Sequence, residues 1–338
     1  MPNSLIICIT IGFFLFGCCY VCCETTTNIM QLVETIKLEK KSGSVDQIIV
    51  LMNGNIVVRD FSVDSLEQQK IEIYDHSGRF LRRVGDYGKG PGKYYRLLDM
   101  RIIENELWVP DVSGRINIFS FSGDFISSFL LLKPFVPNNI CFSKTLQQFF
   151  VTGRLAYGDS KNNYYILHKY SVKDKKYLHS YLSCDQEIFE KEIYGLLFTL
   201  IDRDVNGKLY LAQAPIHKIY IFDPNNDNCK EFKLNSKKIR SVGSLVNKHT
   251  AEKTTELYDN SFLVTSLHVL KSSIWITIKD PINKNSVLEV KDLNGRTLYQ
   301  DIILEGKLVG KDDAGNIYIT ERNNESYSIL KYKTKIHD

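Results

Sequence analysis

The body of the chain repeats a short apolar segment that has a bulky residue at its centre in most copies. Three copies follow similar turns, MNGN at 52–55, VNGK at 205–208 and DAGN at 313–316, where glycine can take the positive φ of a tight turn. Neighbouring residues of a strand point to opposite faces, so uninterrupted apolar residues predict strands buried on both sides. The six copies are Ile56-Val57-Val58, Leu107-Trp108-Val109, Phe149-Phe150-Val151, Leu209-Tyr210-Leu211, Ile274-Trp275-Ile276 and Ile317-Tyr318-Ile319.

A second series of strands follows the first, and each of its members but one ends in an aromatic residue. Its members recur at intervals of roughly 40 to 70 residues, the spacing of propeller blades with insertions. With one strand before and one after each pair, every unit has four strands. The pattern therefore predicts an all-β fold, a six-bladed β-propeller of four-stranded antiparallel blades. The end residues are Tyr74, Phe119, Tyr170, Phe222 and Tyr332, with Lys291 as the exception.

The two ends of the chain complement each other. Residues 33–40, VETIKLEK, form a surplus strand before the first unit, whereas the last unit stops one strand short after Tyr332. An unpaired edge strand favours aggregation, so closing the ring removes a liability. We therefore expect the N-terminal strand to complete the sixth blade.

The stretch IEIYDHSGRFLRRVGDYGKGPGKYY at 71–95 carries a family resemblance. It is similar to the repeat of NHL-type propellers, in which a Gly-x-Gly-Pro-Gly-x-aromatic loop joins the outermost strand of one blade to the innermost strand of the next. The resemblance is specific over residues 71–129 and is weaker elsewhere. It implies that the loop turns the chain between blades, with Tyr94 or Tyr95 filling the gap.

A phosphate-binding loop is the competing interpretation of the same glycines. That motif requires Gly-Lys-Ser/Thr at the start of a helix, whereas here Gly92-Lys93 precedes Tyr94-Tyr95 and a strand. The dinucleotide fingerprint needs a βαβ unit, which an all-β chain lacks. Nucleotide binding is therefore not expected.

The N-terminus indicates export. Residues 5–21 are apolar but short for a membrane span of about 20 residues. Leu15-Phe16-Gly17-Cys18 resembles a bacterial lipobox, although no Lys or Arg precedes it. We expect a signal peptide at 1–18 with lipidation of Cys18, a tether at 19–32 and the propeller at 33–338, which would anchor the protein in the outer membrane or periplasm. A cleaved signal without lipid and a retained anchor remain alternatives.

Charge and cysteine content narrow the range of partners. The net charge of +4 is spread along the chain, so nucleic acid is not expected as a partner. The body holds only Cys141, Cys184 and Cys229, too scattered for a disulfide framework or a metal site, and we expect them to be buried.

Propellers bind ligands where their innermost strands converge on the axis. No catalytic residue is predicted. Which side chains of the innermost strands face the axis is not fixed by the sequence, because a shift of one residue in strand register moves each side chain to the opposite face. The insertion at 235–260, with a short helix near 251–258, is a candidate lid or partner contact. The ligand-binding candidates are Tyr94, Tyr95, Arg96, Arg101, Asn139, Arg203 and His268, with Asp99, Asn138, Asp202 and Asp312 beside them.

A metal site is the alternative use of the axis. Gluconolactonase-like six-bladed hydrolases hold a divalent metal with carboxylate and amide oxygens, which Asp202, Asp312 and Asn139 would supply for calcium here. No motif marks these three residues, so no cofactor is expected.

Two functions remain in view. The chain resembles six-bladed NHL-like lipoproteins of Gram-negative bacteria, which implies a lipid-anchored binding module that recognises a peptide, glycan or partner protein at the axial mouth. The alternative is a hydrolase or lyase with an axial divalent metal. Catalysis is the less favoured of the two, and fold alone does not decide between them.

Overall fold

The computed structural model describes most of the chain after the N-terminal leader. The predicted signal segment, with Cys18, and residues 19–28 of the predicted tether lie outside the described residues. The described ranges are 29–39, 44–60, 69–131, 136–154, 165–193, 196–243, 251–322 and 327–336.

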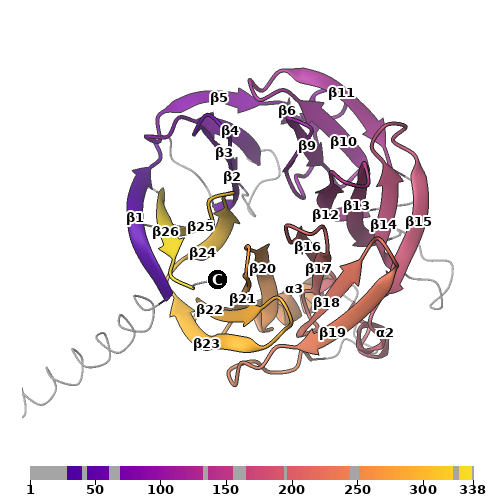
Figure 1. Ribbon diagram of the computed structural model, residues 1–338, viewed down its shortest axis with the longest axis vertical. Coiled ribbons are helices and arrows are strands. Elements are labelled where there is room, and N and C mark those ends of the chain that lie inside the picture. The colour runs from indigo at the N-terminus through magenta and orange to yellow at the C-terminus, as the bar shows by residue number, and fades with distance from the viewer. Residues whose placement is uncertain are drawn as a thin grey trace, which may run out of the picture.

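Six four-stranded antiparallel sheets surround a common axis, so the predicted six-bladed propeller is confirmed (Figure 1). Blade one contains β2 (Val45–Val50), β3 (Ile56–Asp60), β4 (Lys70–Tyr74) and β5 (Phe80–Val84). Blade two contains β8 (Arg101–Ile103), β9 (Glu106–Pro110), β10 (Arg115–Phe119) and β11 (Phe125–Leu130). Blade three contains β12 (Val136–Ser143), β13 (Gln148–Arg154), β14 (Tyr165–Ser171) and β15 (Tyr177–Ser183).

The second half of the ring repeats this order from the axis outward. Blade four contains β16 (Thr199–Arg203), β17 (Leu209–Gln213), β18 (Lys218–Asp223) and β19 (Asn228–Lys233). Blade five contains β20 (Leu263–Val269), β21 (Ser273–Asp280), β22 (Asn285–Asp292) and β23 (Thr297–Leu304). Blade six contains β24 (Lys307–Lys311), β25 (Asn316–Arg322), β26 (Tyr327–Thr334) and β1 (Met30–Lys37).

The N-terminal strand closes the ring as expected. β1 pairs with β26 antiparallel, from Met30 opposite Thr334 to Lys37 opposite Ser328. It begins three residues before the expected start, because Met30 is buried in the core between blades five and six. Strands from both ends of the sequence therefore form one blade.

In each blade, the apolar residue at the centre of the second strand from the axis packs in the core shared with a neighbouring blade. Trp108 of blade two, for example, packs with Phe149 and Val151 of blade three. Burial of each such side chain contributes roughly 1.5–3 kcal/mol. Six equivalent interfaces explain why the apolar triplet recurs in every blade. These residues are at most 1% exposed: Val57, Trp108, Phe150, Tyr210, Trp275 and Tyr318.

Asp-x-x-Gly turns connect several strands. In the turn after β16, Asp204 Oδ1 accepts from the backbone N–H groups of Asn206 and Lys208, and Gly207 has a φ of +85°. An aspartate that bonds its own turn, followed by a glycine with positive φ, is a favourable hairpin corner. The same arrangement recurs at Asp75, Asp292 and Asp312.

The glycine-rich loop turns the chain between blades one and two, as expected. It contains the short strands β6 (Asp86–Tyr87) and β7 (Lys93–Tyr94). Gly90 and Gly92 have φ of +122° and +71°. Tyr94 fills the gap between the two blades: it is 1% exposed, and its hydroxyl donates to the carbonyl of Val84 at 3.2 Å.

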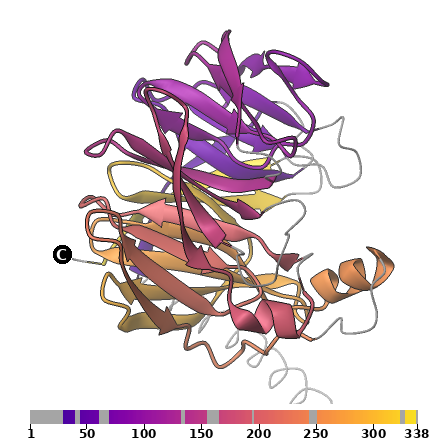
Figure 2. The ribbon, with the colours of Figure 1, turned by 90° about the vertical axis from the view of Figure 1, so that its right-hand side faces the viewer.

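Two short helices lie in connections between blades. α2 (Gln186–Glu190) precedes β16, and α3 (Ala251–Asp259), close to the predicted helix, precedes β20. Both connections lead into an innermost strand, so they lie on the face where innermost strands begin, which we call the entry face. The opposite end is the exit face. Figure 2 shows α3 projecting beyond the body of the ring.

The cysteine prediction is partly wrong. Cys141 and Cys184 are buried, but Cys229 is exposed on the outermost strand of blade four. An outermost strand has one face toward solvent, so a small apolar residue there need not be covered.

Candidate functional site: a charged cluster on the propeller axis

Side chains from all six blades lie close together on the axis, along the innermost strands. The group contains two carboxylates, three cations, an amide, an imidazole and a thiol. We call it the axial cluster, and it consists of Gln47, Asp99, Arg101, Cys141, Asp202, Arg203, His268 and Lys311.

Asp99 joins the first three blades. Its fully buried carboxylate accepts from Gln47 Nε2 of blade one at 2.6 Å and from the backbone N–H of Ile140 in blade three at 2.8 Å. Arg101 Nε of its own blade lies 3.2 Å from the same carboxylate. A buried carboxylate with three donors is fully compensated.

Asp202 joins the other three blades in the same way. Its carboxylate accepts from the backbone N–H of Arg203 in blade four at 2.9 Å and from that of Val269 in blade five at 2.8 Å. Lys311 Nζ of blade six lies 2.6 Å from Oδ2. The two carboxylates therefore divide the ring into two linked halves.

One cation, Arg101, connects these halves across the axial region. Arg101 of blade two donates from Nη2 to the carbonyl of Ile201 in blade four at 3.1 Å, passing blade three. Lys311 also donates to the carbonyl of Val269. The Arg101 side chain thus reaches from one half of the ring to the other, whereas the Lys311 contacts stay within the second half.

The environment shifts the pKa of three groups that face the cations of the cluster. Although burial opposes ionisation, Lys311 and Arg101 hold the pKa of Asp202 below its usual value. Burial lowers the pKa of His268 to about 4 and raises that of Cys141 to about 11. At neutral pH the imidazole and the thiol are therefore uncharged, and three cations face two carboxylates.

Arg203 is the charged member of the cluster whose side chain has no hydrogen-bond or ion-pair partner among the described residues. Its backbone N–H donates to Asp202, but its guanidinium makes no hydrogen bond or ion pair with any residue that the structure describes. It lies within electrostatic range of Cys141, as do Arg101 and Lys311. An arginine with free donors therefore lies beside the axis.

Only some of the residues proposed from sequence meet here. Arg101, Arg203 and His268 belong to the axial cluster. Tyr94 is buried between blades, where no ligand reaches its ring. Tyr95 lies outside the cluster and stacks on Tyr87, with ring centroids 5.5 Å apart.

Arg96 also lies apart from the cluster, and the Asn139 side chain makes no hydrogen bond to any described member of it. Arg96 is within electrostatic range of Tyr258 on α3, which places it on the entry face. The backbone N–H of Asn139 donates to Thr152 Oγ1 at 3.1 Å within blade three. Arg96 therefore belongs to the surroundings of α3 rather than to the axial cluster.

The sequence interpretation missed Lys311, Gln47 and, as a site residue, Cys141. A signal for Lys311 exists: it directly precedes the Asp-x-x-Gly turn that ends the innermost strand, as Arg203 does in blade four. Gln47 and Cys141 have no such motif, because their place depends on strand register.

The three proposed metal ligands do not come together as a site. The carboxylate of Asp312 bonds within its own turn, where Tyr318 OH donates to Oδ2 at 2.8 Å. Asp202 is engaged by three donors. The ranges described by the structure contain no group of three or more His, Cys, Asp or Glu side chains able to hold a metal.

Helix α3 reaches over the entry face. Lys279 of blade five donates to the Tyr258 carbonyl at 3.0 Å, and its Nζ lies 4.4 Å from the centre of the Tyr258 ring. Asp46 of blade one and Arg96 of blade two lie within electrostatic range of the same tyrosine. The helix therefore faces three blades.

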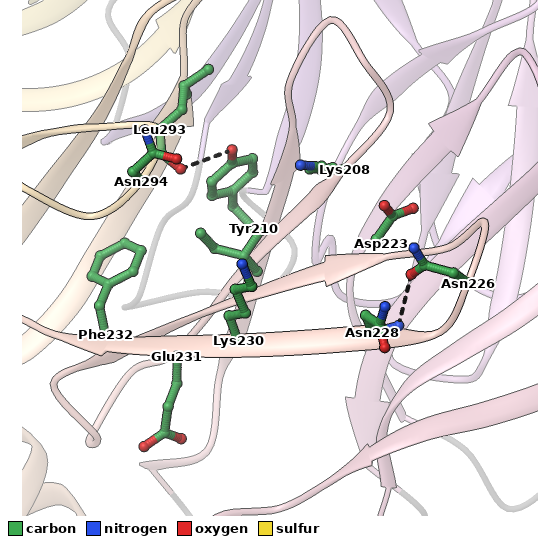
Figure 3. Close-up of a pocket in the computed structure, with 11 residues that line it drawn as sticks. Lys208, Tyr210, Asp223, Asn226, Asn228, Lys230, Glu231, Phe232, Leu293 and Asn294 are labelled. Carbon is green, nitrogen blue, oxygen red and sulfur yellow. Dashed lines mark hydrogen bonds between the residues drawn. The ribbon is translucent and has the colours of Figure 1, made fainter.

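A hollow of about 440 Å³ lies between blades four and five (Figure 3). Tyr210 lies behind it, and its hydroxyl donates to the Leu293 carbonyl at 3.4 Å. The walls carry amide, ammonium and carboxylate groups from strand β19 and from the turns beside it, with Asp223 and Glu231 as the acidic residues. Its polar wall residues include Lys208, Asn226, Asn228, Lys230 and Asn294.

Solved structures share the fold at low identity. A Bacteroides fragilis protein described as exported is 15% identical, with 91% of this chain and 96% of the other covered and a TM-score of 0.63. The RRP9 WD40 repeats are 14% identical, with 90% and 100% covered and a TM-score of 0.57. A catalytically inactive virginiamycin B lyase from Staphylococcus aureus, solved with quinupristin, is 10% identical, with 89% and 99% covered and a TM-score of 0.52. These likenesses show the fold alone.

A search among curated proteins finds no match to the chain. Among the residues that the structure describes, no helix has the length and apolar character needed to cross a membrane. A family model matches residues 21–302, which include nearly all of the first five blades and the N-terminal strand. The chain belongs to this family, DUF5128, described as a 6-bladed beta-propeller.

Proposed function

We propose that the protein is an exported, lipid-anchored binding module of the cell envelope that recognises a peptide, glycan or partner protein at the axial mouth. One observation carries the proposal: six blades converge on a charged cluster whose carboxylates are hydrogen-bonded, while no described residue uses the guanidinium donors of Arg203. Such an arrangement is rigid and offers recognition groups on a scaffold, which suits binding.

Export and anchoring are proposed from the leader. The apolar segment 5–21 ends near the lipobox-like Leu15-Phe16-Gly17-Cys18. The similar fold of a protein described as exported agrees with that address. Replacing Cys18 by serine should move the protein from the membrane fraction to the soluble fraction, and equal membrane retention would contradict lipid anchoring.

Catalysis with an axial metal has less support from the geometry. A hydrolase or lyase of that type needs several free oxygen ligands around one point. Asp99 and Asp202 each accept three hydrogen bonds from the protein. A lyase is among the proteins of similar fold, but in this chain both carboxylates are already engaged by protein donors.

Binding can be tested with the mature chain on arrays of glycans and of peptides. A specific ligand should bind the parent and bind Arg203→Gln at least tenfold more weakly, while calorimetry with calcium should show no heat of binding. Absence of any specific ligand, or calcium binding that Asp202→Asn abolishes, would overturn the binding-module proposal.

A further inference from the structure

Beyond the class of protein, the axial cluster carries information about the chemical group that it recognises. We infer that the group is a carboxylate, bound by Arg203 together with Arg101 and Lys311. The inference rests on the proposed binding function and narrows its ligand to an acidic one.

Charge balance is the first step. Asp99 and Asp202 compensate two of the three cations, which leaves one positive charge in the cluster. His268 does not change this balance, because its pKa of about 4 keeps it neutral at physiological pH. A surplus cation in a partly buried site is costly unless an anion compensates it.

Unused hydrogen-bond donors are the second step. Arg101 uses Nε and Nη2, while its Nη1 has no hydrogen-bond partner in the described part of the chain. Lys311 uses two of its three N–H groups on Asp202 and Val269. Arg203 uses none of its guanidinium donors on described residues. The free hydrogen-bonding capacity of the three cations therefore consists of donors, which an acceptor-only group satisfies.

The low exposure of the cluster is the third step. The Asp202 side chain is 8% exposed, and the side chains of Lys311 and Arg101 are 24% and 27% exposed. Charge-assisted hydrogen bonds are stronger in such surroundings than at a fully exposed surface. The free donors are thus placed where one anionic group would gain most from them.

The surplus of one positive charge in the cluster favours a carboxylate over a phosphate monoester as the bound group. One positive charge is neutralised by one negative charge, whereas a phosphate monoester carries about −1.5 to −2 at neutral pH. The planar guanidinium of Arg203 also matches the two oxygens of a carboxylate. An acidic sugar and a peptide C-terminus would both present this group.

The test uses the mature chain and defined probes. Calorimetry would compare glucuronate with glucose, and the dipeptide Gly-Gly with its C-terminal amide, which separates the sugar from the peptide source. At least one acid should bind tenfold or more tightly than its neutral partner. Inorganic phosphate should bind more weakly than that acid.

Variants connect the binding to the cluster. Arg203→Gln should abolish the preference for the acid, and Arg203→Lys should retain part of it. The matched control Arg79→Gln, on an exposed turn of blade one, should bind as the parent does. Equal binding of acid and neutral probes, tighter binding of phosphate, or an unchanged preference in Arg203→Gln would overturn the inference. A neutral ligand found on the arrays would leave the binding module standing and refute the carboxylate alone.

Discussion

Lys291 donates to Glu289 at 2.8 Å in the interior of blade five, and neither side chain has any exposed surface. Lys291 also donates to Thr297 Oγ1 at 2.7 Å. In blade one, Tyr74 occupies the corresponding position and donates to Glu72 at 2.6 Å. The lysine that interrupts the aromatic series therefore performs the same task, since it supplies a donor to a buried glutamate two residues earlier.

The first prediction concerns this pair. Lys291→Met should lower the free energy of unfolding by about 3–5 kcal/mol, because it leaves the buried Glu289 without its cation. Lys291→Tyr should cost clearly less, since a phenol can donate as Tyr74 does in blade one. Denaturant unfolding of both variants measures these losses of stability. Equal losses in the two variants would show that the hydrogen bond donated to Glu289 is not the main contribution of Lys291 to stability.

The second prediction concerns the axial link between Asp202 and Lys311. A double-mutant cycle with Asp202→Asn and Lys311→Met should give a coupling energy of about 1–3 kcal/mol. The exposed pair Arg82 and Asp124, with side chains 48% and 73% exposed, is the control and should give less than about 1 kcal/mol. Comparable values for the two pairs would contradict a structural role for the axial link.

The third prediction is a pH dependence caused by His268. Burial depresses its pKa to about 4, so the unfolded chain, with an ordinary histidine pKa near 6.5, binds more protons between these values. Stability should therefore fall as pH falls through this window, with about 2 kcal/mol lost at pH 5 from this residue.

Substitution isolates that contribution. His268→Asn should remove its part of the acid sensitivity in chemical denaturation at pH 7 and pH 5. His168, with a pKa also near 4, should contribute separately. The exposed His76 is the control, and its replacement by asparagine should not alter the slope. An unchanged slope in His268→Asn would show that the imidazole is charged in the folded state.

The fold could be predicted from the sequence because each blade must bury both faces of its second strand. Trp108 and Trp275 are central in such strands, and their positions mark two blades before any coordinates are known. Ring closure was also predictable, since a surplus strand at one end matched a missing strand at the other. The exact start of β1 was not, because it depends on Met30 packing between two blades.

The site was predictable only in part because its geometry depends on register and on contacts across the ring. Arg101 and Arg203 could be named from their place on innermost strands. That Arg101 would contact Ile201 in blade four follows from the curvature of the ring, which no local pattern encodes. Lys311 lay in a recognisable turn context, but its partner Asp202 belongs to another blade.

The fourth prediction concerns ring closure at the contact between β1 and blade one. Gly78 has a φ of +90°, and a Cβ there would lie 2.1 Å from the Lys37 carbonyl oxygen. Gly78→Ala should therefore lower stability by more than the roughly 1 kcal/mol of a positive φ alone. Gly315→Ala, with a φ of +81° and open space around it, is the matched control. Equal losses in thermal unfolding would mean that β1 does not press against this turn.

The last prediction treats the glycine-rich loop as part of the scaffold. Gly90→Ala should cost about 1–3 kcal/mol through its φ of +122°, although nothing lies within 4 Å of the added Cβ. Gly92→Ala adds a second penalty, because its Cβ would lie 3.2 Å from the ring of Phe125. Lys89→Ala should change stability by less than about 0.5 kcal/mol, since an exposed lysine outside any special geometry contributes little.

A phosphate-binding loop would behave differently, and the same variants distinguish the two roles. Melting curves of the parent, Gly90→Ala, Gly92→Ala and Lys89→Ala would be recorded with and without millimolar ATP and magnesium. A scaffold loop gives losses in the glycine variants that nucleotide does not alter. If nucleotide raises the melting temperature of the parent and Lys89→Ala loses that rise, the loop binds phosphate and its glycines serve the ligand rather than the join between blades.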